Sequence, residues 1–189
     1  MTKKYKLTEK YIIPNGVKLF QIQALVSFGT VSSGDLGGYI EKEENLAQDG
    51  DAWVSDNAWV SGNAKVCGDA KVYGNAKVHG NAWVHGDAKV YGNATVYGNA
   101  NVHGDALVCG DACVYGIGAI FWASRVGTEN GTITVTSGQN GLVVTRGCFT
   151  GTKEEFLSAS AAKHNEKIQR EYRLLIEVAE SRIEHHSVN

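Results

Sequence analysis

Proline is nearly absent from this chain, and so are long apolar runs. One Pro stands beside 23 Gly in 189 residues, a balance that fits repeated tight turns better than extended linkers. No window approaches the ~20 apolar residues of a membrane-spanning helix, and the N-terminal residues lead into a strand-like pattern without a secretory signal. We therefore expect no association with a membrane.

Cysteine pairs and an excess of one charge are also missing. The four cysteines are Cys67, Cys109, Cys113 and Cys148, with no C-x-x-C pair and no dense disulfide spacing. Unpaired thiols in outward strand positions favour the reducing cytoplasm, and none is tied by the pattern to a His that would make it a nucleophile. A net charge of −2 gives no general attraction to nucleic acid.

What the sequence does contain is one six-residue repeat running from Asp51 to Gly116. Each unit holds Ala, a variable residue, Val, a second variable residue, Gly, and then Asn or Asp. Self-similarity at a short fixed period is typical of a solenoid. The repeated valines are Val54, Val60, Val66, Val72, Val78, Val84, Val90, Val96, Val102, Val108 and Val114, and the same spacing reaches Ile120 and Val126.

Alternation within a unit predicts a short strand followed by a corner. Ala70 and Val72 point to one side of such a strand, and Lys71 and Tyr73 to the other. Gly followed by Asn or Asp then provides the positive-φ backbone of a sharp turn. Three faces would close a triangular coil of eighteen residues.

The corner residues support this closure, because they sort by type at intervals of eighteen. One series is acidic, and the others are almost entirely Asn. The acidic series is Asp51, Asp69, Asp87 and Asp105, and the others are Asn57, Asn75, Asn93, Asp111 and Asn63, Asn81, Asn99. Outward rings show the same spacing: Tyr73 with Tyr91; His79 with Tyr97 and Tyr115; His85 with His103 and Phe121. We expect these residues to stack in neighbouring coils at ~4.8 Å.

The repeat block resembles the left-handed parallel β-helix of the hexapeptide-repeat superfamily, and the resemblance implies the left hand. The segments Lys4–Glu9, Leu19–Phe28, Gly37–Ile40 and Gln48–Val54 are similar in order and spacing to YdcK-like bacterial proteins, which are described as transferases largely because of their fold. The tail from Gly127 resembles C-terminal modules of prophage-type repeat proteins.

Both ends of the chain depart from the repeat, as the terminal coils of a solenoid require. We expect a mainly β protein with an N-terminal β cap (1–45), a β-helix (46–126), a β-hairpin (127–151) and C-terminal helices (152–189). The hairpin would pair 132–136 with 142–145 through a turn at 137–141. Thr152 and Glu155 form a capping-box pattern. The helix would be interrupted near 163–165, and a second apolar stripe would pack on the hairpin or on a partner chain.

The acidic column Asp51, Asp69, Asp87 and Asp105 is the most unusual electrostatic feature. Two exposed carboxylates ~4.8 Å apart repel by roughly 1 kcal/mol. Backbone N–H groups, together with Lys71 and Lys89, would offset this repulsion. The alternative is weak binding of Ca²⁺ along the corner.

Three histidines, His79, His85 and His103, occupy the outward position after Val. In hexapeptide-type acyltransferases a His is the general base and acetyl-CoA lies between subunits, so the resemblance offers these residues as catalytic candidates. The same position also holds Tyr, Ser and Cys in other units, which favours structural stacking. A metal site at His85, His103 and Cys67 is a further alternative, without visible additional ligands.

Outward aromatic residues are numerous enough to predict a covered surface. They are Trp53, Trp59, Trp83, Tyr73, Tyr91, Tyr97, Tyr115, Phe121 and Trp122. The main hypothesis is a non-enzymatic scaffold without cofactor that forms a dimer or trimer or binds a protein or small molecule. The alternatives are an acetyl-CoA-dependent acyltransferase and a phage-encoded factor that sequesters a host signal or inhibits a host defence protein. The pattern does not favour nucleic acid as a ligand.

Overall fold

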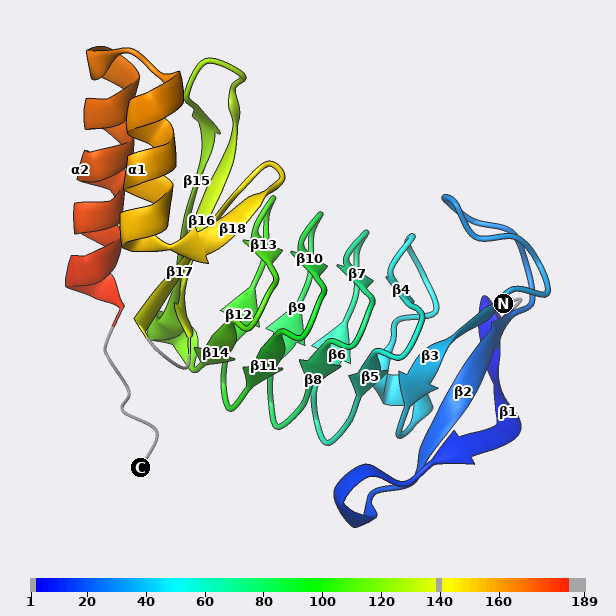
Figure 1. The fold of residues 1–189 in the computed structure, drawn as a ribbon. Coiled ribbons are helices and arrows are strands. Elements are labelled where there is room, and N and C mark those ends of the chain that lie inside the picture. The colour runs from blue at the N-terminus through cyan, green and yellow to red at the C-terminus, as the bar shows by residue number, and fades with distance from the viewer. Residues whose placement is uncertain (1–2, 139–140, 184–189) are drawn as a thin grey trace.

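The computed structural model describes residues 3–138 and 141–183 of an elongated β protein (Figure 1). An antiparallel N-terminal segment leads into a column of short parallel strands. A four-stranded antiparallel sheet and two helices follow at the other end of the column. None of the described helices is long and apolar enough to cross a membrane.

The N-terminal segment folds into strands β1 (Tyr5–Ile12), β2 (Leu19–Ala24) and β3 (Leu36–Ile40). They pair antiparallel in this order, and β3 then pairs parallel with the solenoid strand β5. Short 3₁₀ turns lie at η1 (Pro14–Gly16) and η2 (Glu43–Asn45). The alternating strands expected in this segment are therefore present, and they extend one solenoid sheet.

The repeat block forms a parallel solenoid with three faces. Every third strand pairs in register, so that Lys71 lies opposite Lys89 and Val72 opposite Val90. The predicted coil of eighteen residues is confirmed. The three sheets have the orders β3-β5-β8-β11-β14, β4-β7-β10-β13 and β6-β9-β12. Their strands are β4 (Trp53–Val54), β5 (Trp59–Val60), β6 (Lys65–Val66), β7 (Lys71–Val72), β8 (Lys77–Val78), β9 (Trp83–Val84), β10 (Lys89–Val90), β11 (Thr95–Tyr97), β12 (Asn101–Val102), β13 (Leu107–Val108) and β14 (Cys113–Tyr115).

The interior of the solenoid consists of the repeated Ala and Val side chains, which are almost completely buried from Ala52 to Val114. The corners depend on glycine. Gly74, for example, has φ +70°, and a Cβ atom there would lie 3.1 Å from the backbone nitrogen of Gly92 in the next coil. A larger residue would combine an unfavourable φ with a steric conflict between coils.

Each coil donates backbone hydrogen bonds to the next one, as in Trp53 N to Ala70 O at 3.0 Å. Carbonyls of the first coil therefore need other donors, because no coil precedes them. The buried Lys4 ammonium donates to the carbonyls of Asp49, Gly50 and Ala52 at 3.0–3.2 Å. N-terminal side chains thus take the place of a missing coil.

Parallel stacking ends at β14. After the turn η3 (Ile117–Ala119), strand β15 (Ile120–Val126) pairs antiparallel with β16 (Gly131–Gly138), and β17 (Gly141–Arg146) and β18 (Phe149–Thr152) complete the sheet. The predicted hairpin of 132–136 with 142–145 is confirmed, but the predicted turn at 137–141 is too long, because Ser137 pairs with Leu142 and Gly138 with Gly141. Residues 139 and 140 lie outside the described residues. The valine spacing through Ile120 and Val126 does not make another parallel coil, because no Gly-Asx corner separates these two residues.

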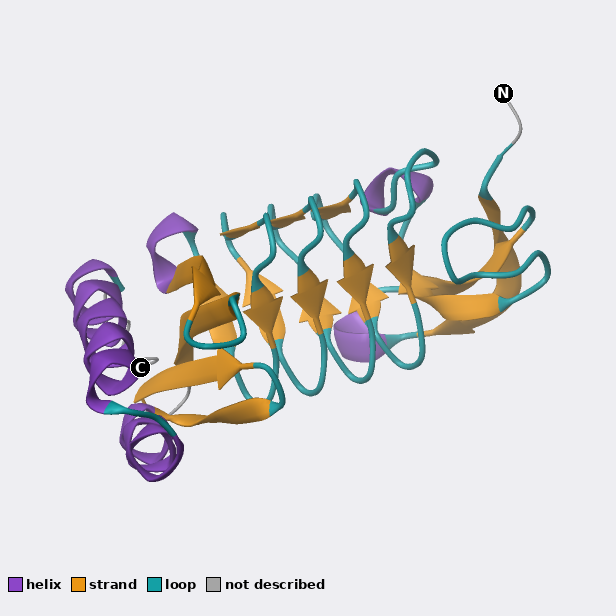
Figure 2. Ribbon diagram, turned by 90° about the horizontal axis from the view of Figure 1, so that it is seen from above, coloured by secondary structure: helices purple, strands orange, loops and turns teal. Residues whose placement is uncertain are grey.

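Helices α1 (Lys153–Lys163) and α2 (Glu166–Arg182) cover one face of this sheet (Figure 2). The predicted capping box is confirmed: Glu155 N donates to Thr152 Oγ1 at 3.2 Å, and Thr152 N donates to Glu155 Oε2 at 2.8 Å. The predicted interruption is also present, since Asn165 caps α2. The apolar stripe of α2 packs within the chain, where Tyr172, Ile176, Ala179 and Ile183 join the core of the sheet.

Candidate functional site

Aromatic side chains form columns on the outside of the coils, as the eighteen-residue spacing predicts. On the sheet β4-β7-β10-β13, Tyr73 and Tyr91 are parallel, with ring centroids 4.9 Å apart and an interplanar angle of 1°. Burial raises the pKa of both hydroxyl groups, so they stay neutral. The next position, Cys109, is buried beneath the C-terminal sheet, where its thiol lies 3.0 Å from Thr150 Oγ1.

A longer column crosses the sheet β3-β5-β8-β11-β14. Trp59 stacks on His79 at 5.7 Å, His79 stacks on Tyr97 at 5.3 Å, and Tyr97 contacts Tyr115 at 4.8 Å. Tyr115, at the C-terminal end of the column, is 43% exposed. Stacked rings of this kind stabilise neighbouring strands.

The third column lies on the sheet β6-β9-β12. His85 stacks on His103 at 5.1 Å, and Trp83 contacts His85 at 4.3 Å. The Trp83 indole N–H donates to the Cys67 sulfur at 3.2 Å. Trp83 is 47% exposed.

One predicted ring contact is wrong, and one outward ring, Trp53 opposite Lys71, is covered. Phe121 does not continue the column above His103: Trp122 does so, edge to face at 4.4 Å, and Phe121 packs against the core of the C-terminal sheet. Within β15 the side chains still alternate: Ile120 and Trp122 pack against the solenoid core, and Phe121 and Ala123 pack against the core of the C-terminal sheet. Trp53 is buried, in edge-to-face contact with Tyr5 and Phe28 of the N-terminal segment.

Two of the columns lie on the two sheets that adjoin one corner of the prism, and we call their rings the aromatic surface. The chain passes from one sheet to the other through Gly80 and Asn81, and the corner amides are linked along the prism, with Asn81 Nδ2 donating to Asn99 Oδ1 at 3.1 Å. The aromatic surface comprises Trp59, His79, Tyr97, Tyr115, Trp83, His85, His103 and Trp122.

The three candidate histidines are held by their stacking neighbours. Burial, with a smaller effect of Lys77, lowers the pKa of His79; burial, with His85 nearby, lowers that of His103. Both are therefore neutral at pH 7. His85 Nε2 lies 3.0 Å from Asn101 Oδ1. None of the three histidines lines the groove over the acidic corner or the pocket beside the C-terminal helices.

The acidic column differs chemically from the Asn corners, because a carboxylate has no N–H to donate along the column. Asp51 N donates to Asp69 Oδ1 at 3.1 Å, and Ser124 Oγ donates to Asp105 Oδ2 at 3.1 Å. Lys71 Nζ donates to the Asp51 carbonyl. These contacts agree with the expected offset by backbone donors and lysine.

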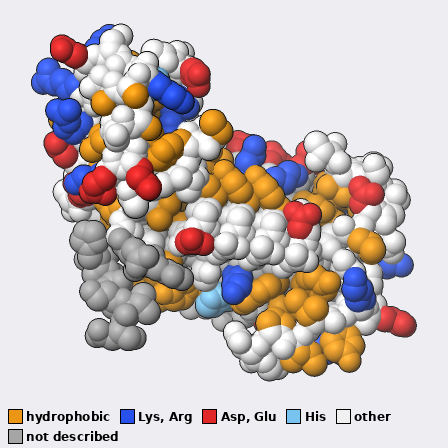
Figure 3. Space-filling view, in the orientation of Figure 1, with side chains coloured by type: hydrophobic (Ala, Val, Ile, Leu, Met, Phe, Trp, Pro, Cys, Tyr) orange, Lys and Arg blue, Asp and Glu red, His pale blue; other side chains and the backbone are white. Residues whose placement is uncertain are grey.

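A groove of about 800 Å³ runs over this corner, from Thr30 in the N-terminal segment to Arg125 and Arg146 in the C-terminal sheet. Asp51, Asp69, Asp87, Asp105, Lys71 and Lys89 all line it. Figure 3 shows the hollow along the upper edge of the coils, with side chains of both charges gathered in it. Over residues 3–138 and 141–183, no group of three or more His, Cys, Asp or Glu side chains is arranged to hold a metal ion.

The side chains that donate to the carbonyls of the first coil, in place of a preceding coil, were not among the predicted residues. Besides Lys4, Asn45 is fully buried and donates from Nδ2 to the carbonyls of Gly62 and Ala64, at 3.1 and 2.8 Å. The repeat gives no signal for these residues because they lie outside it. In the sequence each of them is simply a polar residue near apolar ones, and this pattern is equally typical of a residue that faces solvent.

Comparison with known proteins supports the solenoid. Residues 88–104 match a family model described as the YdcK beta solenoid repeat. This match covers roughly one coil, and it lies where the parallel pairing of β10 to β12 is regular. A comparison with curated proteins finds no match. The repeat of this β-solenoid is thus similar to that of the YdcK family.

Proposed function

We propose that this protein is a non-enzymatic β-solenoid scaffold that self-associates through its aromatic surface. The observation that carries the proposal is the presence of two ring columns on adjoining sheets, with Trp83 47% and Tyr115 43% exposed. Large exposed aromatic side chains at the centre of a surface are typical of contact sites between proteins. Stacking explains why the rings are ordered, but it leaves these two partly uncovered.

The spacing of the rings favours a second copy of the chain as the partner. Neighbouring rings in the columns are separated by 4.8–5.7 Å between centroids along the prism. A partner that covers several rings must present contacting groups at the same spacing. Another copy of the chain already has rings at this spacing. A two-fold axis across the corner would pair identical surfaces. The resemblance to the hexapeptide superfamily, in which self-association is common, supports the same proposal.

Replacing Trp83 by Lys and Tyr115 by Ser should separate the copies. Lys65, Lys71, Lys77 and Lys89 fill the position of Trp83 in other units, and Ser61 fills that of Tyr115, so both changes suit the coil. Loss of one well-buried aromatic contact costs about 2 kcal/mol, so we expect the dissociation constant to rise at least about tenfold. Sedimentation velocity over a concentration series would measure it.

A matched control is Tyr11→Ser, because Tyr11 is 48% exposed on the N-terminal hairpin, outside the aromatic surface. We expect this variant to associate like the unchanged protein. A protein that stays monomeric throughout the micromolar range, or equal weakening in the control, would contradict the proposal.

Acetyl-CoA should leave the melting temperature unchanged, since a scaffold has no site for it; a saturable rise would favour the acyltransferase hypothesis.

A further inference from the structure

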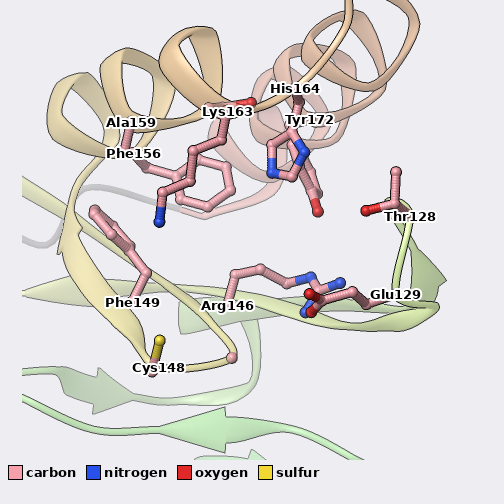
Figure 4. A pocket seen from close by; sticks show the side chains of 12 residues that line it. Thr128, Glu129, Arg146, Cys148, Phe149, Phe156, Ala159, Lys163, His164 and Tyr172 are labelled. Carbon is pink, nitrogen blue, oxygen red and sulfur yellow. The ribbon is translucent and has the colours of Figure 1, made fainter.

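A second, smaller pocket lies between the C-terminal sheet and the two helices, away from the aromatic surface (Figure 4). It encloses about 190 Å³. Arg146 and Phe149 contribute from β17 and β18, Phe156 and Ser160 from α1, and Tyr172 from α2. Figure 4 shows the helix residues above the pocket and Arg146 along its floor.

The apolar wall of the pocket is a chain of four rings in edge-to-face contact. Phe149 meets Phe156 at 5.3 Å, Phe156 meets Tyr172 at 5.1 Å, and Tyr172 meets His164 at 5.7 Å between centroids. Each ring holds the next in place, so the wall is preorganised. Such a wall suits a flat apolar group, which can add another edge-to-face or offset contact.

Two side chains that line the pocket keep buried polar atoms without a partner. Arg146 donates from Nη2 to the Val126 carbonyl at 3.0 Å, but its Nε is unpaired. Ser160 is only 5% exposed, and its hydroxyl has no hydrogen-bond partner, although a helical Ser commonly bonds to the carbonyl one turn earlier. A buried unpaired polar group costs about 1–3 kcal/mol. Both atoms are buried within the wall of the pocket, so they show that this wall holds polar side chains with unused donors, while the remaining N–H groups of Arg146 are the ones that can meet an acceptor.

The charges of the lining also favour an acceptor. Arg146 and Lys163 carry two positive charges against the single negative charge of Glu129. Figure 4 shows the Lys163 and His164 side chains extending from the helices toward the space above Arg146. An anionic oxygen placed there can accept charge-assisted hydrogen bonds.

We propose that this pocket binds a small organic anion carrying one aromatic ring, with a carboxylate or phosphate directed to Arg146 and the ring against Phe149 and Phe156. The volume sets the size, because a cavity of about 150 Å³ holds a benzene molecule. About 190 Å³ therefore accommodates one ring and its acidic group. The ring wall provides the contact area, and the positive charges of Arg146 and Lys163 provide the selection for an anion.

The test is a titration of the full chain with benzoate, phenyl phosphate and benzyl alcohol, followed by ¹H–¹⁵N NMR. We expect saturable shifts for the two anions at amides of residues 146–149 and 156–164, and none for the neutral alcohol. Whichever anion binds more tightly identifies the acidic group. Saturation by benzyl alcohol at the same concentrations would overturn the proposal, because the site would then recognise only the ring.

Two variants and one control separate binding from folding. Arg146→Lys keeps the charge but removes the planar guanidinium, which can bind an oxyanion through two N–H groups, and should weaken binding about tenfold. Lys163→Gln removes an exposed charge without touching the core, and should weaken it about threefold. Lys167→Gln makes the same change on α2 outside the pocket and should have no effect. Equal affinities for Lys163→Gln and Lys167→Gln, or no saturable shift with either anion, would contradict the site.

Discussion

Replacing Val84 by Asp is expected to lower the melting temperature by about 10 °C or more. Val84 is fully buried between Val66 and Val102 of the adjacent coils. A carboxylate there has no hydrogen-bond donor, because the interior around it consists of Ala and Val. Burying it costs at least about 4 kcal/mol, and each kcal/mol corresponds to about 2–4 °C in a chain of this length.

The matched control for this change is Lys65→Asp. Lys65 precedes Val66 in the same sheet, but its side chain points outward and is exposed. The control introduces the same residue type one position away from a core valine, and we expect a melting temperature within about 2 °C of the unchanged protein. Thermal unfolding followed by circular dichroism measures both. Equal stability of the two variants would show that Val84 is not an inward residue.

Replacing Lys4 by Met should destabilise the protein by about 3 kcal/mol. The change keeps a long flexible side chain but removes the donor to three first-coil carbonyls, each worth about 1 kcal/mol. Burial lowers the pKa of Lys4 to about 8, while Asp49 and other carboxylates raise it, so the ammonium is charged at pH 7. Its position over the Phe28 ring, 4.9 Å from the centroid, adds to the loss.

We expect the loss at Lys4 to lower the melting temperature by about 6–12 °C and to speed amide hydrogen exchange in the first coil. Lys6→Met is the control, since Lys6 lies two positions after Lys4, in β1, and is exposed. It should change neither quantity. If Lys4→Met melts like Lys6→Met, the ammonium does not replace the missing coil.

The regular part of the fold was predictable because each unit repeats the same local instructions. The alternation within each unit places Ala and Val in the interior, and Gly marks each corner. The eighteen-residue coil therefore follows from the sequence without knowledge of any contact. The ring pairs Tyr73–Tyr91 and His85–His103 were likewise predictable, since stacking in a parallel solenoid depends only on the spacing.

Prediction failed where the chain leaves the repeat. Phe121 occupies the right position by counting, but β15 leaves the coil to join the C-terminal sheet, so Phe121 packs against the core of that sheet and Trp122 contacts His103. Trp53 follows the repeat and is nevertheless buried, because the N-terminal segment packs over it. The wrong contact of Phe121 and the burial of Trp53 both come from contacts between distant segments, and spacing contains no information about such contacts.

The pocket between the sheet and the helices was not predictable for the same reason. Arg146 belongs to β17, Ser160 to α1 and Tyr172 to α2, and no motif joins them in the sequence. Each alone has an ordinary interpretation: Arg146 ends a strand, Ser160 lies in a helix and Tyr172 belongs to an apolar stripe. Only packing brings the unpaired Ser160 hydroxyl and the Arg146 guanidinium to one cavity.

Disulfide formation between Asn81→Cys and Asn99→Cys would test the eighteen-residue lap most directly, with the four native cysteines replaced by Ser. The two amides are hydrogen-bonded at 3.1 Å, and adjacent strands lie ~4.8 Å apart, within the range that a disulfide spans. Peptide mapping under non-reducing conditions should find this link, and should find none between Asn81→Cys and Asn93→Cys, which lie on different corners. A link in the second pair and none in the first would contradict the stacked-coil architecture.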